Sequence, residues 1–86
     1  MATEQLIGTV SHYFKQPSVA VVRVTDGELA MSDEIHFLGH TTDFTEKITS
    51  MEVDHEKVEG AKVGDEVAIK IVDRARIHDK VFKIVE

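Results

Sequence analysis

Apolar residues recur at every second position over much of the chain, and many of them are β-branched. This period is typical of strands, in which successive side chains point to opposite faces. In residues 18–24 one face of the expected strand carries Ala20, Val22 and Val24. In residues 66–72 the alternation is cleaner, and one face carries Val67, Ile69 and Ile71. Phe82 and Ile84 repeat it near the end of the chain. Each of these segments is predicted to be a strand with one face in a core.

Further strands are expected at residues 5–13, 34–39 and 45–53. The last of these segments contains a mismatch, because Ile48 falls on the opposite face from Met51 and Val53. A bulge near residues 49–50 would reconcile its two halves, since a bulge inserts one extra residue and reverses the alternation.

Turn-forming residues separate these runs. Residues 15–18 contain Pro17, which lacks a backbone donor and suits a turn. Asp26-Gly27 is the commonest short-range signal for a hairpin. Residues 56–62 are the one candidate for a helix, and they provide only one or two turns.

This pattern predicts an all-β fold in which six or seven short strands form a small closed β-barrel. Closure would remove unpaired strand edges. A length of 86 residues allows one domain with one modest core, so residues 1–86 are expected to form a single β-barrel domain. A multidomain enzyme is excluded.

One short pattern occurs twice. After their first position, residues 30–37 and 62–69 both read apolar, small, Asp, Glu, apolar, any, apolar. The small residue would relieve backbone strain in a turn, and Asp33 or Asp65 would accept backbone N–H bonds there. We interpret the pattern as a turn that starts a strand, rather than as a pair of catalytic carboxylates.

The formal net charge is −6, from 10 Lys and Arg against 16 Asp and Glu. Such a field opposes nonspecific binding to phosphate backbones and anionic lipid. The chain has no cysteine, so disulfides, thiolate zinc sites and cysteine nucleophiles are excluded. The sequence shows no secretory signal, no transmembrane run and no phosphate-binding loop. We therefore expect a cytoplasmic protein that binds neither a membrane nor a nucleotide.

The histidines raise the question of a metal site, since His36, His40 and Asp43 are close in sequence. On a strand, however, four residues span about 13 Å, which is too far for one ion unless Gly39 turns the chain. Ser11 and His12 are adjacent, so on a strand they point to opposite faces and cannot act together in a hydrolase. We expect no metal, no cofactor and no catalytic residue, and the chain is predicted not to be an enzyme.

The segment His40, Thr41, Thr42 and Asp43 is a candidate recognition loop. Its hydroxyls and carboxylate can bond backbone N–H groups, and Phe44 can anchor it to the core. The structural interpretation, in which these residues only fold the loop, is favoured over recognition.

Charge is unevenly distributed along the chain. Residues 1–64 hold five Lys and Arg against eleven Asp and Glu, whereas residues 65–86 hold five of each. The candidate RNA-binding residues are the cations Lys15, Lys70, Arg74, Arg76 and Lys83. If exposed, Tyr13 and Phe14 would add a stacking surface for a base. The alternative, an ordinary solvated surface of mixed charge, is slightly favoured.

The order of these motifs resembles the second, β-barrel domain of translational GTPases such as elongation factor Tu, and most closely the small translation elongation factor-like proteins. The resemblance covers about residues 7–84, and residues 19–39, 48–53 and 61–67 carry it. It implies a six-stranded barrel that, in the full-length factors, packs beside a GTPase domain and contacts tRNA or ribosomal RNA.

Two main functional hypotheses follow, and a small enzyme with a histidine or metal site is a third, less favoured one. The first is a non-catalytic, translation factor-like barrel that binds tRNA, ribosomal RNA or the ribosome. The alternative is a protein-interaction module that docks on a partner enzyme or factor without RNA contact, which fits the acidic field better.

Overall fold

The computed structural model describes residues 3–85, which form strands and no helix. Period-two alternation thus becomes strand throughout, which confirms the predicted all-β class. The strands are β1 (Thr3–Phe14), β2 (Val19–Val24), β3 (Glu28–Ala30), β4 (Glu34–Leu38), β5 (Asp43–Lys47), β6 (Met51–Val53), β7 (Glu56–Lys57), β8 (Gly60–Lys62), β9 (Glu66–Lys70) and β10 (Lys80–Val85). No helix in the described part of the chain is long and apolar enough to cross a membrane.

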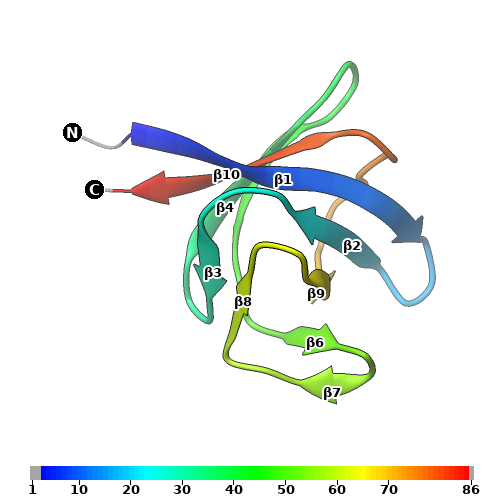
Figure 1. Ribbon diagram of the computed structural model, residues 1–86. Coiled ribbons are helices and arrows are strands. Elements are labelled where there is room, and N and C mark those ends of the chain that lie inside the picture. The colour runs from blue at the N-terminus through cyan, green and yellow to red at the C-terminus, as the bar shows by residue number, and fades with distance from the viewer. Residues whose placement is uncertain (1–2, 86) are drawn as a thin grey trace.

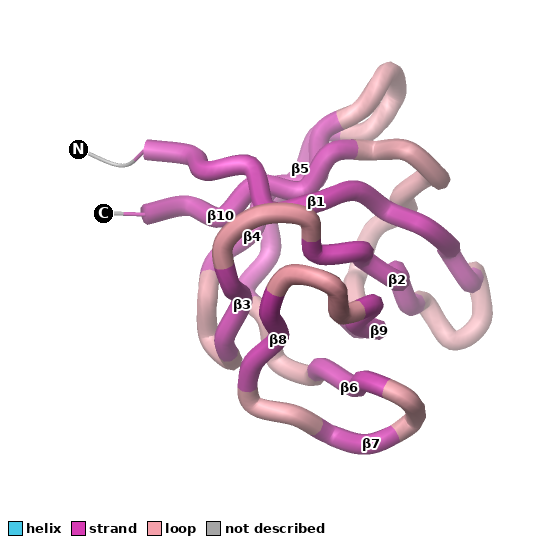
Figure 2. The backbone as a smooth tube through the Cα atoms, in the orientation of Figure 1, coloured by secondary structure: helices cyan, strands magenta, loops and turns pink. Residues whose placement is uncertain are grey.

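Eight strands form one sheet in the order β5-β4-β10-β1-β2-β9-β6-β7, and β3 pairs with β8 separately. Figure 1 shows the large sheet curling around the interior, with β1 and β10 side by side. Figure 2 shows the loops that connect these strands. The pairing leaves β5 and β7 as edges and does not close the sheet, so closure into a barrel stays a prediction.

Both sheets contribute to one core. One face of β2 and one face of β9 are buried, as predicted, with Val22 and Val67 fully covered. Leu29 from β3 and Ala61 from β8 join the same cluster, so the small sheet covers part of the interior. Burial of this apolar area is the main force that stabilises the fold.

The repeated Asp pattern forms the turn that the sequence predicts. Ala30 N donates to Asp33 Oδ2 at 2.8 Å, and Lys62 N donates to Asp65 Oδ2 at 3.0 Å. The residue before each Asp is in the left-handed region, with φ of 74° at Ser32 and 99° at Gly64. Each turn leads directly into a strand of the large sheet, β4 in the first case and β9 in the second.

A third copy of this turn precedes β10, and the sequence did not reveal it. Arg76 N donates to Asp79 Oδ2 at 2.7 Å, and Asp79 N donates back to Arg76 O at 3.1 Å. His78 occupies the left-handed position with φ of 78°. A histidine there breaks the small-residue pattern, although the geometry is the same.

Two local predictions are wrong because non-local pairing overrides them. The helix expected at residues 56–62 is absent, and that segment forms β7 and β8 instead. Its backbone bonds go to distant residues, since Met31 N donates to Glu59 O at 3.0 Å. The Asp26-Gly27 hairpin is also absent, because β3 pairs with β8 and not with β2.

Two strand predictions need correction in detail. The segment 45–53 is not one bulged strand, because residues 48–50 separate β5 from β6. In β10 the fully buried residue is Val81, whereas Phe82 and Ile84 are half-buried. Both faces of β10 are therefore partly covered, which a simple alternation does not predict.

Candidate functional site

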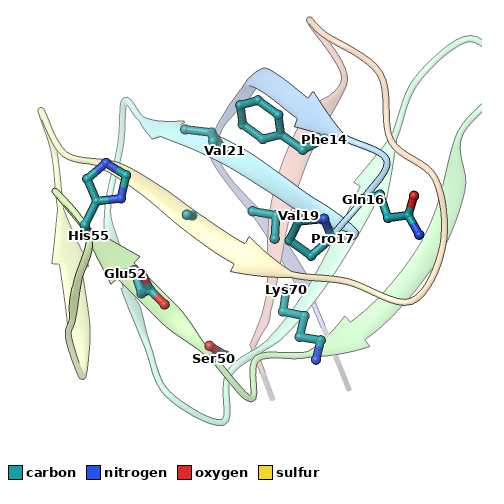
Figure 3. Close-up of a pocket in the computed structure, with 10 residues that line it drawn as sticks. Phe14, Gln16, Pro17, Val19, Val21, Ser50, Glu52, His55 and Lys70 are labelled. Atoms are coloured by element: carbon teal, nitrogen blue, oxygen red, sulfur yellow. The ribbon is translucent and has the colours of Figure 1, made fainter.

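A shallow groove of about 550 Å³ crosses the face of the large sheet that points away from the core. We call it the outer groove, and its lining residues are Phe14, Gln16, Pro17, Val19, Val21, Ser50, Glu52, His55, Ala68 and Lys70. Figure 3 shows these side chains gathered on one side of β2, β9 and the 50–55 segment. The floor comes from the outward positions of β2 and β9, so alternation along two neighbouring strands builds it.

The floor of the outer groove is apolar, although it faces solvent. Val19, Val21 and Ala68 are half-buried. Phe14 lies at one end of the groove and is 52% exposed. The rim carries charge, with Lys70 at the end of β9 and Glu52 on β6. Such a floor with a polar rim is typical of a surface that binds another molecule.

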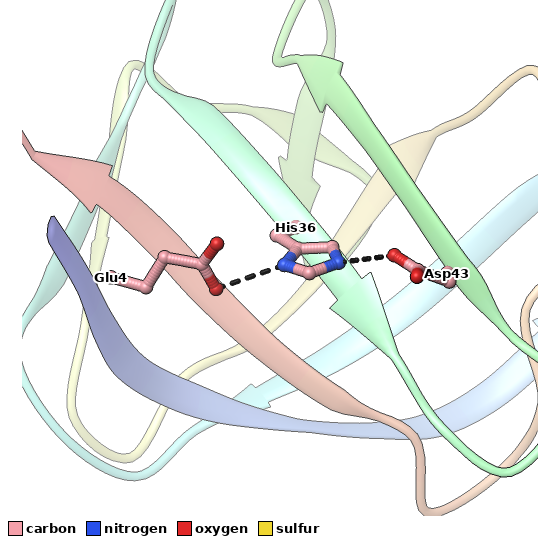
Figure 4. A network of polar contacts seen from close by, with 3 residues as sticks. All are labelled: Glu4, His36 and Asp43. Carbon is pink, nitrogen blue, oxygen red and sulfur yellow. Dashed lines mark hydrogen bonds and ion pairs between the residues drawn. The ribbon is translucent and has the colours of Figure 1, made fainter. Parts of the chain in front are cut away.

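A second polar feature lies across β1, β10, β4 and β5. His36 on β4 places Nδ1 2.9 Å from Glu4 Oε1 and Nε2 2.6 Å from Asp43 Oδ1 (Figure 4). Both partners are carboxylates, so both ring nitrogens donate only when the imidazole is protonated. The hydrogen bond that the ring donates to Glu4, and then the one that it donates to Asp43, raises the pKa of His36 above its ordinary value of 6.5. This line ties edge strand β5 and the start of β1 to β4.

The predicted cations do not form one patch. Lys15 and Lys70 lie at the same end, because Lys70 pairs with Val19 and Lys15 follows β1. Arg74 and Arg76 are exposed in the 71–79 loop, on either side of buried Ala75. Lys83 pairs with Gln5, near the start of β1. Lys15 follows the opposite end of β1, so at about 3.3 Å per residue the strand puts more than about 20 Å between Lys83 and Lys15.

Lys83 is also engaged within the fold. Its Nζ lies 3.4 Å from Asp33 Oδ2 and donates to Glu28 O at 3.3 Å. It therefore holds β10 against the first Asp turn and the start of β3. A binding role for these five cations stays a prediction.

The candidate recognition loop is mostly structural in its contacts. Gly39 N donates to Thr42 O at 2.8 Å, and Thr42 is buried. Asp43 begins β5 and bonds His36, whereas His40 and Thr41 are exposed. The expected anchor is also present, because Phe44 stacks on Phe37 with ring centroids 4.9 Å apart.

The described residues do not assemble an evident hydrolytic site. Ser11 Oγ donates to Val21 O at 3.2 Å and to Glu66 Oε2 at 3.0 Å, so its hydroxyl links β1 to β2 and β9. His12 instead stacks on Phe14, with ring centroids 6.3 Å apart. Across residues 3–85 there is no group of three His, Asp or Glu side chains that could hold a metal ion.

Sequence reasoning missed the outer groove and half of the His36 line. The run Val19 to Val22 is apolar at every position, which is typical of a strand covered on both faces and was the available signal. Glu4 lies 32 residues from His36, so no local spacing could connect them.

Taken together, the strands form a small, curled β-domain, and a solved structure has a similar fold. The C-terminal domain of a putative U32 peptidase of Geobacillus thermoleovorans superposes with a TM-score of 0.84 at 20% sequence identity. The match covers 92% of this chain and 91% of that one. At this identity the match establishes the fold.

Curated proteins with similar sequences are proteases by name. An uncharacterized protease of Methanocaldococcus jannaschii is 35% identical over 81 residues, which is 93% of this chain and 20% of that protein. A collagenase of Porphyromonas gingivalis is 32% identical over 85 residues, 95% of this chain and 20% of that protein. The chain thus spans about a fifth of the length of these relatives. No protein-family model matches it.

These findings correct the resemblance to elongation factor Tu. The matched proteins are proteases and collagenases, and the matched fold is a U32 peptidase domain rather than a translation-factor barrel. The translation factor-like role in binding RNA or the ribosome, which followed from that resemblance, is wrong with it. Strand alternation and short turn motifs do not by themselves identify a family, so the order of the motifs led to the wrong family.

Proposed function

We propose that this chain is a non-catalytic accessory domain of the kind that accompanies the catalytic part of a U32-type peptidase. One observation carries the proposal: nearly the whole chain aligns with only about a fifth of each protease relative. The fold match to a C-terminal domain of a U32 peptidase supports the same assignment.

The chemistry of the chain supports an accessory role. It has no cysteine, and the hydroxyl of Ser11 is engaged by Val21 O and Glu66. Peptide hydrolysis needs an activated nucleophile, and we expect the other four-fifths of such a protein to supply it.

The test is a graft into the Porphyromonas gingivalis collagenase, with three proteins compared. The first is the intact collagenase, the second lacks the 85-residue matching segment, and the third carries this chain in place of that segment. Collagen hydrolysis is measured for each and for this chain alone. We expect the deletion to lower hydrolysis, the graft to restore most of it, and the isolated chain to show none. Hydrolysis by the isolated chain, or a graft no better than the deletion, contradicts the proposal.

A further inference from the structure

Strand β2 presents apolar side chains on both of its faces. Ala20 and Val22 are fully buried in the core, whereas Val19 and Val21 point to the opposite side and form the floor of the outer groove. A strand that is apolar on both faces is typical of a sheet with a second layer packed on it. In residues 3–85 only the core layer is present, so the groove lacks its cover.

Half-buried apolar side chains adjoin one another along the groove floor. Ala68 extends the floor onto β9, and Phe14, 52% exposed, stands at its end. The other exposed large apolar residues do not line this groove: they are Leu6, Leu38, Val63, Val72, Ile77 and Val85. Isolated exposed residues need no partner, but a contiguous floor does.

Charge adds a second requirement for the occupant. Lys70 projects at one end of the groove, and the ion pairs of the described residues, which involve Arg23, His36 and Lys83, do not include it. Lys15 is exposed at the same end. A partner that covers the floor therefore gains from a carboxylate opposite these ammonium groups.

We propose that the outer groove is the surface by which this domain docks on the catalytic part of a U32-type peptidase. The catalytic part contributes apolar side chains over Val19, Val21 and Ala68 and a carboxylate to Lys70. This inference rests on the proposed function, and it adds the contact surface. The relatives support the choice of occupant, because about four-fifths of each relative lies outside the matched segment and is joined to it covalently.

The test is thiol footprinting, which the absence of cysteine from this chain makes clean. Ala68→Cys places a thiol in the groove, and Val63→Cys places one on an exposed turn as a matched control. Each variant is labelled with a maleimide, once as the isolated chain and once within the collagenase graft. Mass spectrometry of the peptide that carries the new cysteine gives the labelling rate.

We expect residue 68 to label about tenfold more slowly in the graft than in the isolated chain, because a covered thiol reacts only when the interface opens. Residue 63 should label equally fast in both. Equal rates at residue 68 overturn the docking surface. If residue 68 of the isolated chain labels slowly only at high protein concentration, a second copy of the chain occupies the groove. If residue 68 of the graft is protected only after collagen is added, the substrate occupies it. Each of those results also overturns the inference.

A pair of charge variants separates this inference from the proposed function. Val21→Arg places a cation on the groove floor, and Val63→Arg is the control. Both are checked for folding by thermal denaturation of the isolated chain. If Val21→Arg grafts lose collagen hydrolysis and Val63→Arg grafts keep it, the surface is supported. If the unmodified graft restores hydrolysis and Val21→Arg does not reduce it, the surface is wrong while the proposed function stands. If the unmodified graft fails to restore hydrolysis, the proposed function itself fails.

Discussion

Replacing the His36 ring in the Glu4–His36–Asp43 line, as in His36→Gln, is expected to weaken the fold in a pH-dependent way. The His36 side chain is only 14% exposed, but its partners Glu4 and Asp43 are 42% and 75% exposed. Exposed ion pairs contribute about 0.2–1 kcal/mol each after solvent screening, so both together stabilise the fold by roughly 0.4–2 kcal/mol. For a domain of this size, 1 kcal/mol corresponds to about 4–8 °C in Tm.

The sign of the pH dependence follows from the direction of the pKa shift. Because the folded-state pKa of His36 is raised, its two ion pairs stabilise the fold fully below pH 6.5, the ordinary value. That stabilisation is lost as the pH rises through the raised pKa. The free energy gap between wild type and His36→Gln should therefore be largest in mild acid and shrink in alkali.

Two measurements check this prediction. NMR titration of the His36 ring should give a pKa above 6.5 in wild type and a lower one in Glu4→Gln and Asp43→Asn. Urea denaturation across the same pH range should show the shrinking gap for His36→Gln. His40→Gln serves as the control, because His40 is exposed and outside the line. A His36 that titrates at or below 6.5, or a gap independent of pH, would refute the reasoning.

Three further predictions concern the fold. Asp79→Ala should lower the free energy of unfolding by about 1–3 kcal/mol and Asp65→Ala by about 0.5–1 kcal/mol in urea denaturation, because Asp79, which accepts from Arg76 N, is buried and Asp65 is partly exposed; equal losses would contradict this. Gly39→Ala should cost about 1–3 kcal/mol by the same method, since its Cβ would lie 1.9 Å from Asp79 Oδ1; an unchanged stability would show that the carboxylate moves aside. Val22→Thr should lower Tm markedly through a buried hydroxyl, whereas Val21→Thr on the outer face should change stability by less than about 0.5 kcal/mol; the reverse order would place the core on the wrong face.

Much of the fold was predictable because it depends on local patterns. Alternation predicted β2 and β9 as strands with one buried face each and identified that face in β9, and the Asp33 and Asp65 turns were recognisable from their own residues. The third turn escaped because His78 adopts the left-handed conformation that Ser32 and Gly64 adopt in the other copies.

The errors lie where distant segments decide the structure. The order of strands in the sheet separates β2 from β3 despite the Asp26-Gly27 signal, since β3 finds its partner in β8. The candidate site was predictable only in part for the same reason. Val19 to Val22 contained the signal for a doubly covered strand, but the contributions of Glu52 and His55 to the groove depend on pairing between β6 and β9.

The measurement that tests the central claim most directly is a crystal structure of the full-length Methanocaldococcus jannaschii protease, which aligns with 93% of this chain. The account predicts that the matching segment adopts the fold in Figure 1 and that the outward faces of the strands equivalent to β2 and β9 are buried against the rest of the protein. A structure in which those two faces point into solvent, while another surface of the domain makes the contact, would contradict it.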